Sequence, residues 1–521
     1  MRRILVLLLV PIALSFGQTP KIPKDALVGY RTITASDLKA HLSFIASPEL
    51  EGRETAARGQ KVAARYIASE FQRLGLKPIG DSGTYFQHFK VETPKIDEKS
   101  TIAVTTKQGT THFQLAKDFF AFSAPSASIS VPAVFIGYVD TKVDSNLVKG
   151  KVVLAFAGRR VDSKDTSVVP MRRLGLVRQF PGSLATLVIA DESGPGSMEV
   201  MLPRLSAMMS RGGRMTIAGG QRSTRGGFPT MISPNMATEI LKGSGKSLDQ
   251  WRDAARQDSV FQPVTLNQTT VTLDISSSSG IKTTENVLGV LEGSDPKLKD
   301  EYVAFTAHFD HLGINADGVV YPGADDDGSG TVTVLELAQA FAANPVKPRR
   351  SLLFMTVVGE EKGLLGSEWY TTHPIIPLEK TVTDLNTDMI GRVDTTHERL
   401  QNSNYVYVIG SDKISTQLDS VLRLSNKLSE NLILDYKYND DKDPEQFYRR
   451  SDHYNFARNG VPIVFFFTGV HADYHRPTDT VDKILFPRME KIVHLIYTTG
   501  WQVANAKTGL AKNVGSSMFS K

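Results

Sequence analysis

Acidic and histidine side chains follow two short apolar runs in the middle of the chain. The first run, 302–307, ends in His308-Phe309-Asp310-His311, and the second, 352–358, ends in Gly359-Glu360-Glu361. Runs of this length, with a helical pattern between them, are typical of buried parallel strands. Chemistry in open α/β sheets collects at the carboxyl ends of such strands. Acids and imidazoles gathered there indicate a hydrolase site that holds two metal ions.

His308 and Asp310 stand two residues apart where the first run ends. Residues with this spacing share one face of an extended segment, so His308 can bind a metal through one ring nitrogen while Asp310 holds the other. The alternative is a histidine at a strand end whose hydrogen bonds the protein itself satisfies. The pair alone fits both interpretations.

Three consecutive carboxylates occupy a glycine-rich loop at 323–330. Asp325, Asp326 and Asp327 repel one another unless a cation lies among them. The alternatives are a solvated turn or a helix N-cap, and Asp327 suits the cap. Because the loop follows the His308 strand end directly, a metal is favoured, and the spacing makes Asp326 the best candidate to bridge two cations.

Two adjacent glutamates close the second run. Neighbouring strand residues point in different directions, so one of Glu360 and Glu361 can bind a metal while the other acts as general base. A glutamate pair is also common on ordinary surfaces. A two-metal site still needs a terminal carboxylate and an imidazole. The candidates in the last third of the chain are Asp384, Asp388, Asp452, His453, His471, Asp473, His475 and Asp479.

The elements that must position these groups follow an α/β pattern. Helices are predicted over 36–50, 59–74, 331–341 and 484–503, and later strands over 382–385, 405–409 and 463–467. Between about 118 and 280 the chain has short apolar runs separated by Gly, Pro and Ser, without a cluster of His, Asp and Glu. We expect a strand-rich insert there that contributes no ligand.

The composition is that of an exported globular protein. Residues 1–17 carry two arginines, an apolar run and small residues placed for cleavage before Gln18, as in a signal peptide. An uncleaved anchor is the alternative. No later stretch is apolar enough to span a bilayer, so we expect a periplasmic or extracellular protein without stable membrane insertion. The net charge of +5 over 521 residues is slight and does not indicate a nucleic-acid partner. Because the chain has no cysteine, a metal must be held by His, Asp and Glu.

The order of these motifs resembles the co-catalytic zinc aminopeptidase family, which includes bacterial secreted leucyl aminopeptidases. Its fold is shared by glutamate carboxypeptidase and transferrin-receptor ectodomains. Glu51-Gly52-Arg53 and Arg450-Ser451-Asp452-His453 belong to the resemblance, and the insert is similar to a protease-associated domain through 148–153 and 228–231. The resemblance implies a zinc-exopeptidase fold, in which helices flank a mixed, mostly parallel central sheet. The implied domains are a signal peptide at 1–17, a catalytic domain at 34–117 and 281–510, and the insert at 118–280.

Carried over by motif, the resemblance implies two zinc ions per chain. The five implied metal ligands are His308, Asp326, Glu361, Asp388 and His475. In the family pattern His308 and Asp388 hold one ion, Glu361 and His475 hold the other, and Asp326 bridges them. No ligand position is substituted in this chain.

Further residues match the family by motif. Glu360 resembles the general base, and Asp310 resembles the partner of the zinc-binding histidine. Ser451, Asp452 and His453 match a motif near the site and are candidates for substrate contacts or for supporting the ligands.

The resemblance implies a secreted metallo-exopeptidase that removes N-terminal residues from peptides with a free amino terminus. Glu360 would act as general base on a water activated by two zinc ions. A carboxypeptidase of the same fold is the alternative, with Arg449 and Arg450 as candidates to bind a C-terminal carboxylate. A single-zinc glutaminyl cyclase and a non-catalytic binding ectodomain fit less well, because the ligand set and Glu360 are intact.

Overall fold

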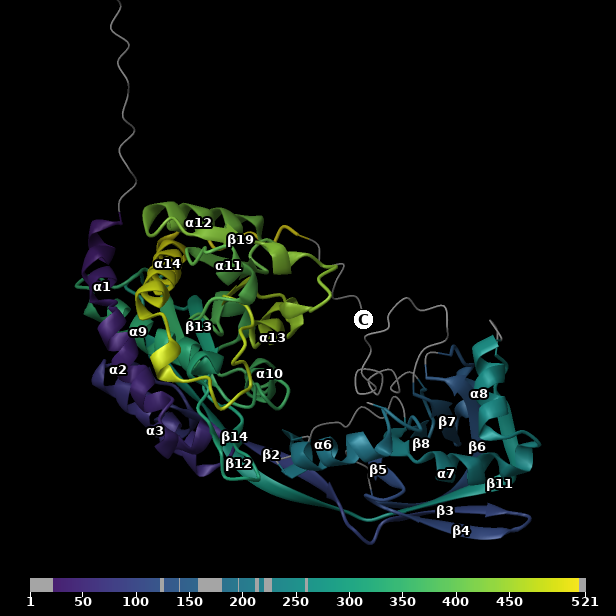
Figure 1. Cartoon of the computed structure of the whole chain (residues 1–521). Helices are drawn as coiled ribbons and strands as arrows, with labels where there is room; N and C mark the ends of the chain where they lie inside the picture. The colour runs from purple at the N-terminus through teal and green to yellow at the C-terminus, as the bar shows by residue number, and fades with distance from the viewer. Residues whose placement is uncertain are drawn as a thin grey trace, which may run out of the picture.

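The computed structural model describes residues 22–514 except 122–125, 140, 158–179, 195, 211–214, 220–226 and 258–260. The expected signal peptide at 1–17 lies outside these residues. Two large sheets organise the described chain, a central sheet surrounded by helices and a second sheet to one side of it (Figure 1). Among the described residues, no helix has the length and apolar character needed to cross a membrane.

The central sheet is mixed, and its middle strands are parallel. Its order is β19 (Ile433–Asp435), β18 (Tyr405–Ile409), β20 (Ile463–Phe467), β17 (Thr381–Thr387), β13 (Tyr302–His308), β16 (Ser351–Val357), β12 (Ser277–Leu291), β2 (Phe86–Ile96) and β9 (Thr216–Ile217), and β1 (Lys77–Pro78) also pairs with β12. β13 pairs in parallel with β16 and β17, and β17 pairs in parallel with β20. Every residue of β16 and β20 is buried, as expected for strands covered on both faces.

Helices cover both faces of this sheet. One face packs against α1 (Leu27–Thr32), α2 (Ala35–Ile45), α3 (Arg58–Arg73), α9 (Gly330–Ala343), α12 (Thr416–Leu428) and α14 (Phe486–Asn505). Val303, Phe305 and Ala307 of β13 belong to that core, whereas Ala304 faces the opposite core, which contains residues of α10 (Leu365–Thr372) and α13 (His453–Ala457). Because side chains alternate along a strand, His308 lies on the same side as Ala304. The predicted strands and helices of this domain are therefore present, although the first helix ends at Ile45 rather than at residue 50.

The second sheet has its own core and its own helices. Its order is β4 (Gly109–Gln114), β3 (Thr101–Thr106), β11 (Val264–Ile275), β6 (Ala127–Tyr138), β7 (Val152–Phe156), β8 (Ala185–Ile189), β10 (Phe228–Ile232) and β5 (Phe119–Ala121). Its helices are α4 (Ser145–Val148), α6 (Met198–Ser210), α7 (Pro234–Leu241) and α8 (Leu248–Gln257). The sheet takes in β3 and β4, which precede the expected start of the insert at 118. The reason is that β3 pairs with β11, Thr105 opposite Thr270, and a short strand pattern does not reveal its partner.

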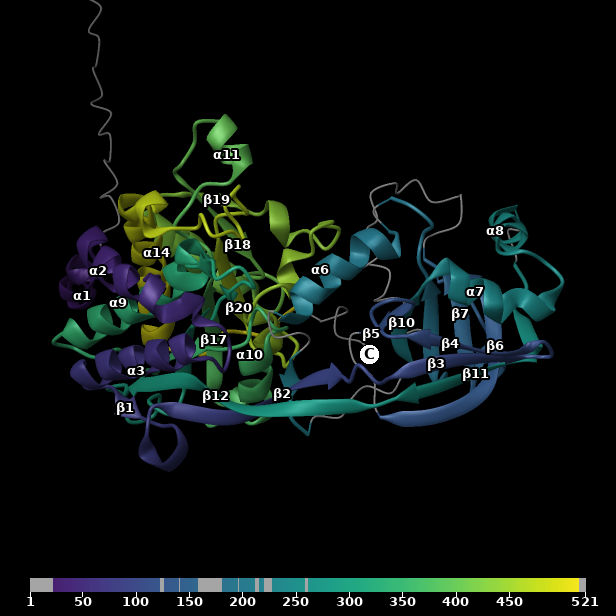
Figure 2. The ribbon, with the colours of Figure 1, turned by 60° about the horizontal axis from the view of Figure 1, so that its bottom comes forward.

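A long two-stranded ribbon joins the two sheets. β2 and β12 pair from Phe86 opposite Val287 to Ile96 opposite Ser277, and the ribbon runs from the central sheet toward the second one (Figure 2). In both ribbon views α6 lies between the two sheets.

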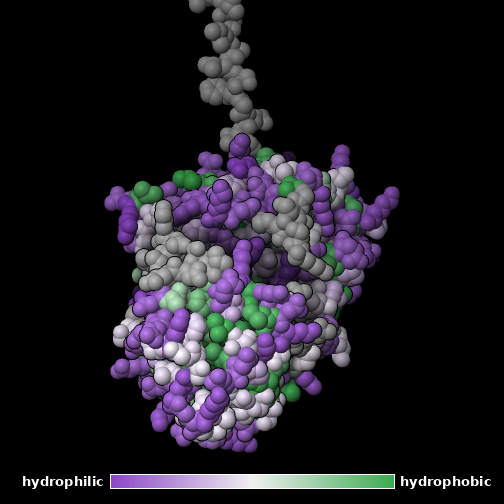
Figure 3. Space-filling view, turned by 90° about the vertical axis from the view of Figure 1, so that its right-hand side faces the viewer, coloured by the Kyte–Doolittle hydropathy of each residue, from purple (hydrophilic) through white to green (hydrophobic). Residues whose placement is uncertain are grey.

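Seen from the side of the second sheet, the surface is largely hydrophilic, with a smaller apolar patch near its middle (Figure 3). β11 of the second sheet continues almost directly into β12 of the central sheet, so the chain leaves and re-enters the central sheet through one ribbon.

Candidate metal centre

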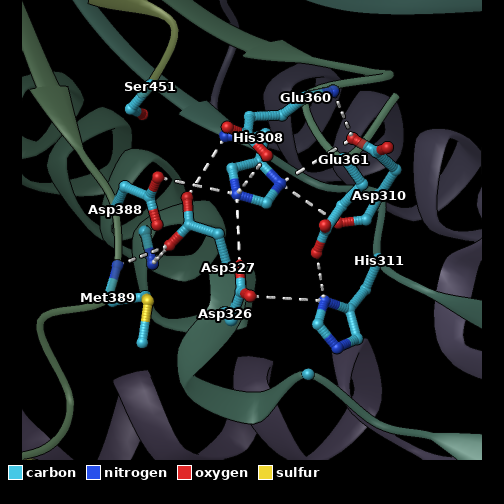
Figure 4. A network of polar contacts seen from close by, with 12 residues as sticks. His308, Asp310, His311, Asp326, Asp327, Glu360, Glu361, Asp388, Met389 and Ser451 are labelled. Atoms are coloured by element: carbon cyan, nitrogen blue, oxygen red, sulfur yellow. Dashed lines mark hydrogen bonds and ion pairs between the residues drawn. The ribbon is translucent and has the colours of Figure 1, made fainter. Parts of the chain in front are cut away.

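The five candidate ligands lie together at the carboxyl ends of the parallel strands. His308 ends β13, Glu361 follows β16, Asp388 follows β17, His475 follows β20, and Asp326 lies in the turn before α9. Figure 4 shows four of them, all except His475, around one centre with Glu360 at its edge. The sequence-predicted ligands therefore meet, although they are separated by up to 167 residues along the chain (475 minus 308).

His308 points one ring nitrogen at the carboxylates and the other at the protein. Its Nε2 lies 3.4 Å from Asp326 Oδ1, 3.7 Å from Asp388 Oδ2 and 3.9 Å from Glu360 Oε2. Its Nδ1 lies 3.1 Å from the main-chain carbonyl of Asp310 and 3.7 Å from Asp310 Oδ1. The nearest support for the ring is therefore the carbonyl of Asp310 and not, as expected from the sequence, its carboxylate.

The carboxylate of Asp310 is used by other groups. It accepts hydrogen bonds from Thr55 Oγ1 at 2.7 Å and from the backbone N–H of Glu360 at 3.3 Å. Asp310 thus links the end of β13 to the end of β16, and it holds the main chain of the proposed general base.

Asp326 lies between the two halves of the cluster. Its Oδ1 faces His308, while its Oδ2 is 3.1 Å from His475 Nε2. The same His475 atom is 3.2 Å from Glu361 Oε2. One carboxylate that contacts both histidines has the arrangement required of a bridging ligand.

The other two aspartates of the loop hold the main chain. Asp327 accepts hydrogen bonds from the backbone N–H groups of His308, Gly330 and Met389, at 3.2, 2.8 and 3.1 Å. It is close enough to His308 and Asp388 to share a metal with them, although these three bonds use most of its acceptor sites. Asp327 accepts from the first N–H of α9, a bond of the capping kind that the sequence offered as an alternative.

The Asp325 carboxylate also contacts the main chain and a neighbouring histidine. Its Oδ1 accepts a hydrogen bond from the N–H of Gly391 at 2.6 Å, and its Oδ2 lies 3.1 Å from His471 Nε2. The backbone N–H groups of Asp325 and Asp326 in turn donate to the Asp479 carboxylate at 3.0 and 3.1 Å. These contacts hold the loop with Asp326 between His308 and His475.

Several polar atoms of the cluster are buried and lack a hydrogen-bond partner within the described chain. They include His308 Nε2, Asp326 Oδ2 and Glu361 Oε1. Burying such atoms without a partner is costly, so a group that binds them is expected. Imidazole nitrogens and carboxylate oxygens are the donors that zinc prefers when thiolates are absent. The residues present therefore fit a metal centre.

The two adjacent glutamates have opposite electrostatic environments. Burial raises the pKa of Glu360 well above its ordinary value, and the nearby His308 offsets this only in part. Burial also raises the pKa of Glu361, but contacts with His311 and His475 outweigh it and lower the pKa to about 2. A pair of carboxyl groups whose pKa values are driven apart is typical of a division between proton transfer and charge stabilisation.

Arg53 of the Glu51-Gly52-Arg53 motif lies beneath the centre. Its fully buried guanidinium donates hydrogen bonds to the main-chain carbonyls of Phe309, Ile45, Pro322 and Gly323 at 2.6–2.9 Å. It therefore joins the end of β13 to the aspartate loop and places a positive charge near the clustered carboxylates. Burial lowers its pKa to about 10, which leaves it cationic at neutral pH.

The Ser451-Asp452-His453 motif does not line the pocket beside the cluster, and its side chains bond to neighbouring residues. Ser451 Oγ accepts a hydrogen bond from Asn386 Nδ2 at 3.0 Å, and Asp452 accepts one from Ser367 Oγ. His453 Nε2 lies 3.0 Å from the carbonyl of Tyr448. All three motif residues are buried, and burial raises the pKa of Asp452 to about 7.

A pocket opens beside the cluster. It is lined by Asp326, Glu360, Asp388, Met389, Phe447, Arg450, Phe465, Phe467, Val470 and Tyr474. Acids of the centre form one wall, and apolar and aromatic side chains form most of the rest. Arg450 is the one basic side chain on it, stacked 4.5 Å from the centre of the Phe447 ring, whereas Arg449 lines a separate depression.

Two residues of the centre had no role in the prediction from sequence. His311 is fully buried beside Glu361, and Arg53 was part of a motif to which no function was attached. A signal for His311 was available in the sequence. It is an ionisable residue close after His308, at a strand end that already carries a candidate ligand. For Arg53 the motif marked the residue but gave no role, because its acceptors are carbonyls of residues far apart in the chain.

Comparison with known proteins supports the resemblance seen in the motifs. Residues 286–499 match the model of peptidase family M28, and this range contains all five candidate ligands. A probable leucine aminopeptidase 2 of Aspergillus oryzae is 34% identical over 205 residues, which cover 39% of this chain and 37% of the relative. Aminopeptidase YwaD of Bacillus subtilis is 28% identical over 222 residues, which cover 41% of this chain and 44% of the relative. The chain thus matches about two fifths of the length of each of these two relatives.

A solved structure extends the likeness to the whole fold. The aminopeptidase from Aneurinibacillus sp. strain AM-1 superposes with a TM-score of 0.55 at 18% identity, covering 94% of this chain and 97% of its own. The α/β fold expected from the resemblance is therefore confirmed.

Proposed function

We propose that this chain is a zinc-dependent aminopeptidase that removes N-terminal residues from peptides. The observation that carries the proposal is the position of Asp326 between His308 and His475, beside buried atoms of His308, Asp326 and Glu361 that lack partners in the described chain. The match to peptidase family M28 and to relatives named as leucine aminopeptidases supports the same activity.

The proposed centre holds two zinc ions. His308 and Asp388 would hold one, Glu361 and His475 would hold the other, and Asp326 lies between the two pairs. Zinc bound there would supply Lewis-acid activation of the peptide carbonyl and of a water molecule.

The proposed general base is Glu360. Its side chain lines the pocket, and its backbone N–H is held by Asp310 Oδ1 at 3.3 Å. Glu360 accepts a proton from the attacking water and returns it to the leaving amine. Its buried position raises its pKa, which favours a group that takes up and releases a proton.

The proposed substrate places its free amino group beside the acids of the centre and its first side chain in the pocket. The apolar wall of Met389, Phe465 and Phe467 suits a large apolar side chain. A panel of aminoacyl anilides, beside N-acetylated and C-amidated peptides, tests this. We expect N-acetylation to abolish hydrolysis and C-amidation to leave it unchanged.

A carboxypeptidase is the second candidate, and Arg450 is the observation that favours it. Its guanidinium lies on the pocket, where it could pair with a C-terminal carboxylate. The same peptides decide between the two, since loss of hydrolysis on C-amidation but not on N-acetylation would establish the carboxypeptidase. Cleavage of uncharged aminoacyl anilides, which have no C-terminal carboxylate, would exclude an obligatory carboxylate contact at Arg450.

We also propose that the chain is exported. The sequence of residues 1–17 supports this. Mass spectrometry of the secreted protein should give an N-terminus at Gln18, and retention of Met1 would contradict cleavage.

A further inference from the structure

His311 lies against the metal centre without a role in the proposed reaction. Its side chain is fully buried, and its Nδ1 is 2.8 Å from Glu361 Oε1 and 3.8 Å from Asp326 Oδ2 (Figure 4). Its ring centre is 6.0 Å from that of His475, which contacts the same two carboxylates.

The surrounding main chain holds the His311 ring in place. The backbone N–H of His311 donates to the carbonyl of Arg53 at 3.2 Å, and Arg53 Nη2 donates to the carbonyl of Gly323 at 2.9 Å. Gly323 has a φ of +56°, and a Cβ there would lie 2.4 Å from Cγ of the His311 ring. The ring therefore fills a space that only glycine leaves open.

The two oxygens of Glu361 face different histidines. Oε2 is 3.2 Å from the proposed ligand His475, whereas Oε1 is in contact with His311. Glu361 Oε1 and His311 Nδ1 are both buried and lack the alignment of a formed hydrogen bond. The terminal torsion of a glutamate is broad, so a small rotation of the carboxylate aligns them.

We propose that His311 is a positioning residue that fixes the carboxylate of Glu361. Its Nδ1–H holds Oε1, which leaves Oε2 directed at the metal beside His475. A carboxylate held in this way loses less conformational freedom when it ligates, and partners of this kind typically change metal affinity ~10–100-fold. The inference rests on the metal site of the proposed function, but it does not depend on peptide hydrolysis.

Three full-length variants test the role of Nδ1. His311→Asn places an amide nitrogen close to the position of Nδ1, His311→Gln places it close to Nε2, and His311→Leu removes both donors. Zinc affinity is measured by competition with a chromogenic chelator, and the absorption spectrum of the Co²⁺-loaded protein reports on the coordination of the ions.

We expect His311→Leu and His311→Gln to bind one of the two zinc ions ~10–100-fold more weakly than wild type, with an altered Co²⁺ spectrum. His311→Asn should stay within about 3-fold of wild type, because it keeps a donor close to Glu361 Oε1. The matched control is His494→Leu. It also removes a ring nitrogen 2.8 Å from a glutamate, Glu430, and should leave zinc affinity unchanged.

Two results would overturn the proposal. Wild-type zinc affinity in all three variants would show that Glu361 needs no such support. An Asn variant as weak as the Leu and Gln variants would show that a donor at Nδ1 is not the cause. If the Leu variant does not fold, the Asn and Gln pair still decides, since both are polar and close to the size of histidine. A wild-type chain that binds no zinc would instead overturn the proposed function itself.

Discussion

Changing Glu360 to Gln should stop catalysis and leave the metal centre intact. The substitution keeps the size of the side chain and removes the oxygen that can take up a proton. The backbone bond from residue 360 to Asp310 does not involve the side chain and remains. Because Glu360 is 3.9 Å from His308 Nε2 and is not one of the proposed ligands, metal binding should be near wild type.

The expected loss follows from the role assigned to the residue. General base catalysis contributes about 10²–10⁴-fold, which at 1.36 kcal/mol per tenfold corresponds to about 3–5 kcal/mol of transition-state stabilisation. We therefore expect kcat on an aminoacyl anilide to fall at least ~100-fold. Zinc content and melting temperature should not change.

Glu361→Gln is the matched control, because it is the adjacent residue and undergoes the same chemical change. Glu361 contacts His311 and His475 and is a proposed ligand, so its loss should weaken zinc binding, and activity should recover in part with added zinc. If Glu360→Gln lost zinc while Glu361→Gln kept both ions, the two roles would be reversed. If neither change lowered kcat, this cluster would not be the active site.

Two predictions concern stability. Arg53→Met should lower the free energy of unfolding by about 3–5 kcal/mol, because four buried carbonyls lose their charged donor; a loss below 1 kcal/mol in urea unfolding would contradict this. Burial raises the pKa of Glu336 on α9 to about 8 from 4.5, so the native state retains a proton that the unfolded state releases, and stability should fall as pH rises from 4.5 to 8. Glu336→Gln keeps the acceptor for the Thr34 N–H and should remove this dependence on pH. The variant should be more stable than wild type by a few kcal/mol above pH 8, and no more stable than wild type below pH 4.5. Equal melting temperatures of the two proteins at pH 9 would refute the assignment.

The sequence predicted the strands and the gathering of ligands because both depend on local patterns. The apolar runs ending at His308 and Glu360 give buried parallel strands, and parallel strands bring their carboxyl ends to one edge. In the loop, Asp327 accepts a hydrogen bond from the first N–H of α9 and Asp326 faces His308, which is consistent with the capping and bridging interpretations.

The features that sequence patterns did not predict depend on contacts between residues far apart in the chain or on the exact direction of the main chain. The support of His308 by a carbonyl of Asp310, rather than by its carboxylate, is set by the exact direction of the chain after β13. The position of His311 depends on a glycine 12 residues further along the chain, Gly323, and Arg53 bonds only to carbonyls, which every residue has. The earlier start of the second sheet reflects the pairing of β3 with β11, more than 150 residues away, which periodicity does not encode.

The most direct test of the account is the number of zinc ions bound per chain, measured by elemental analysis beside activity. We expect about two ions in the wild-type protein, as a dinuclear centre requires, with activity lost on chelation and restored by zinc. Asp326→Asn, which alters the carboxylate in contact with both His308 and His475, should lower the affinity for both ions. Full activity after exhaustive chelation, or two tightly held ions in the Asp326→Asn variant, would contradict a centre bridged by Asp326.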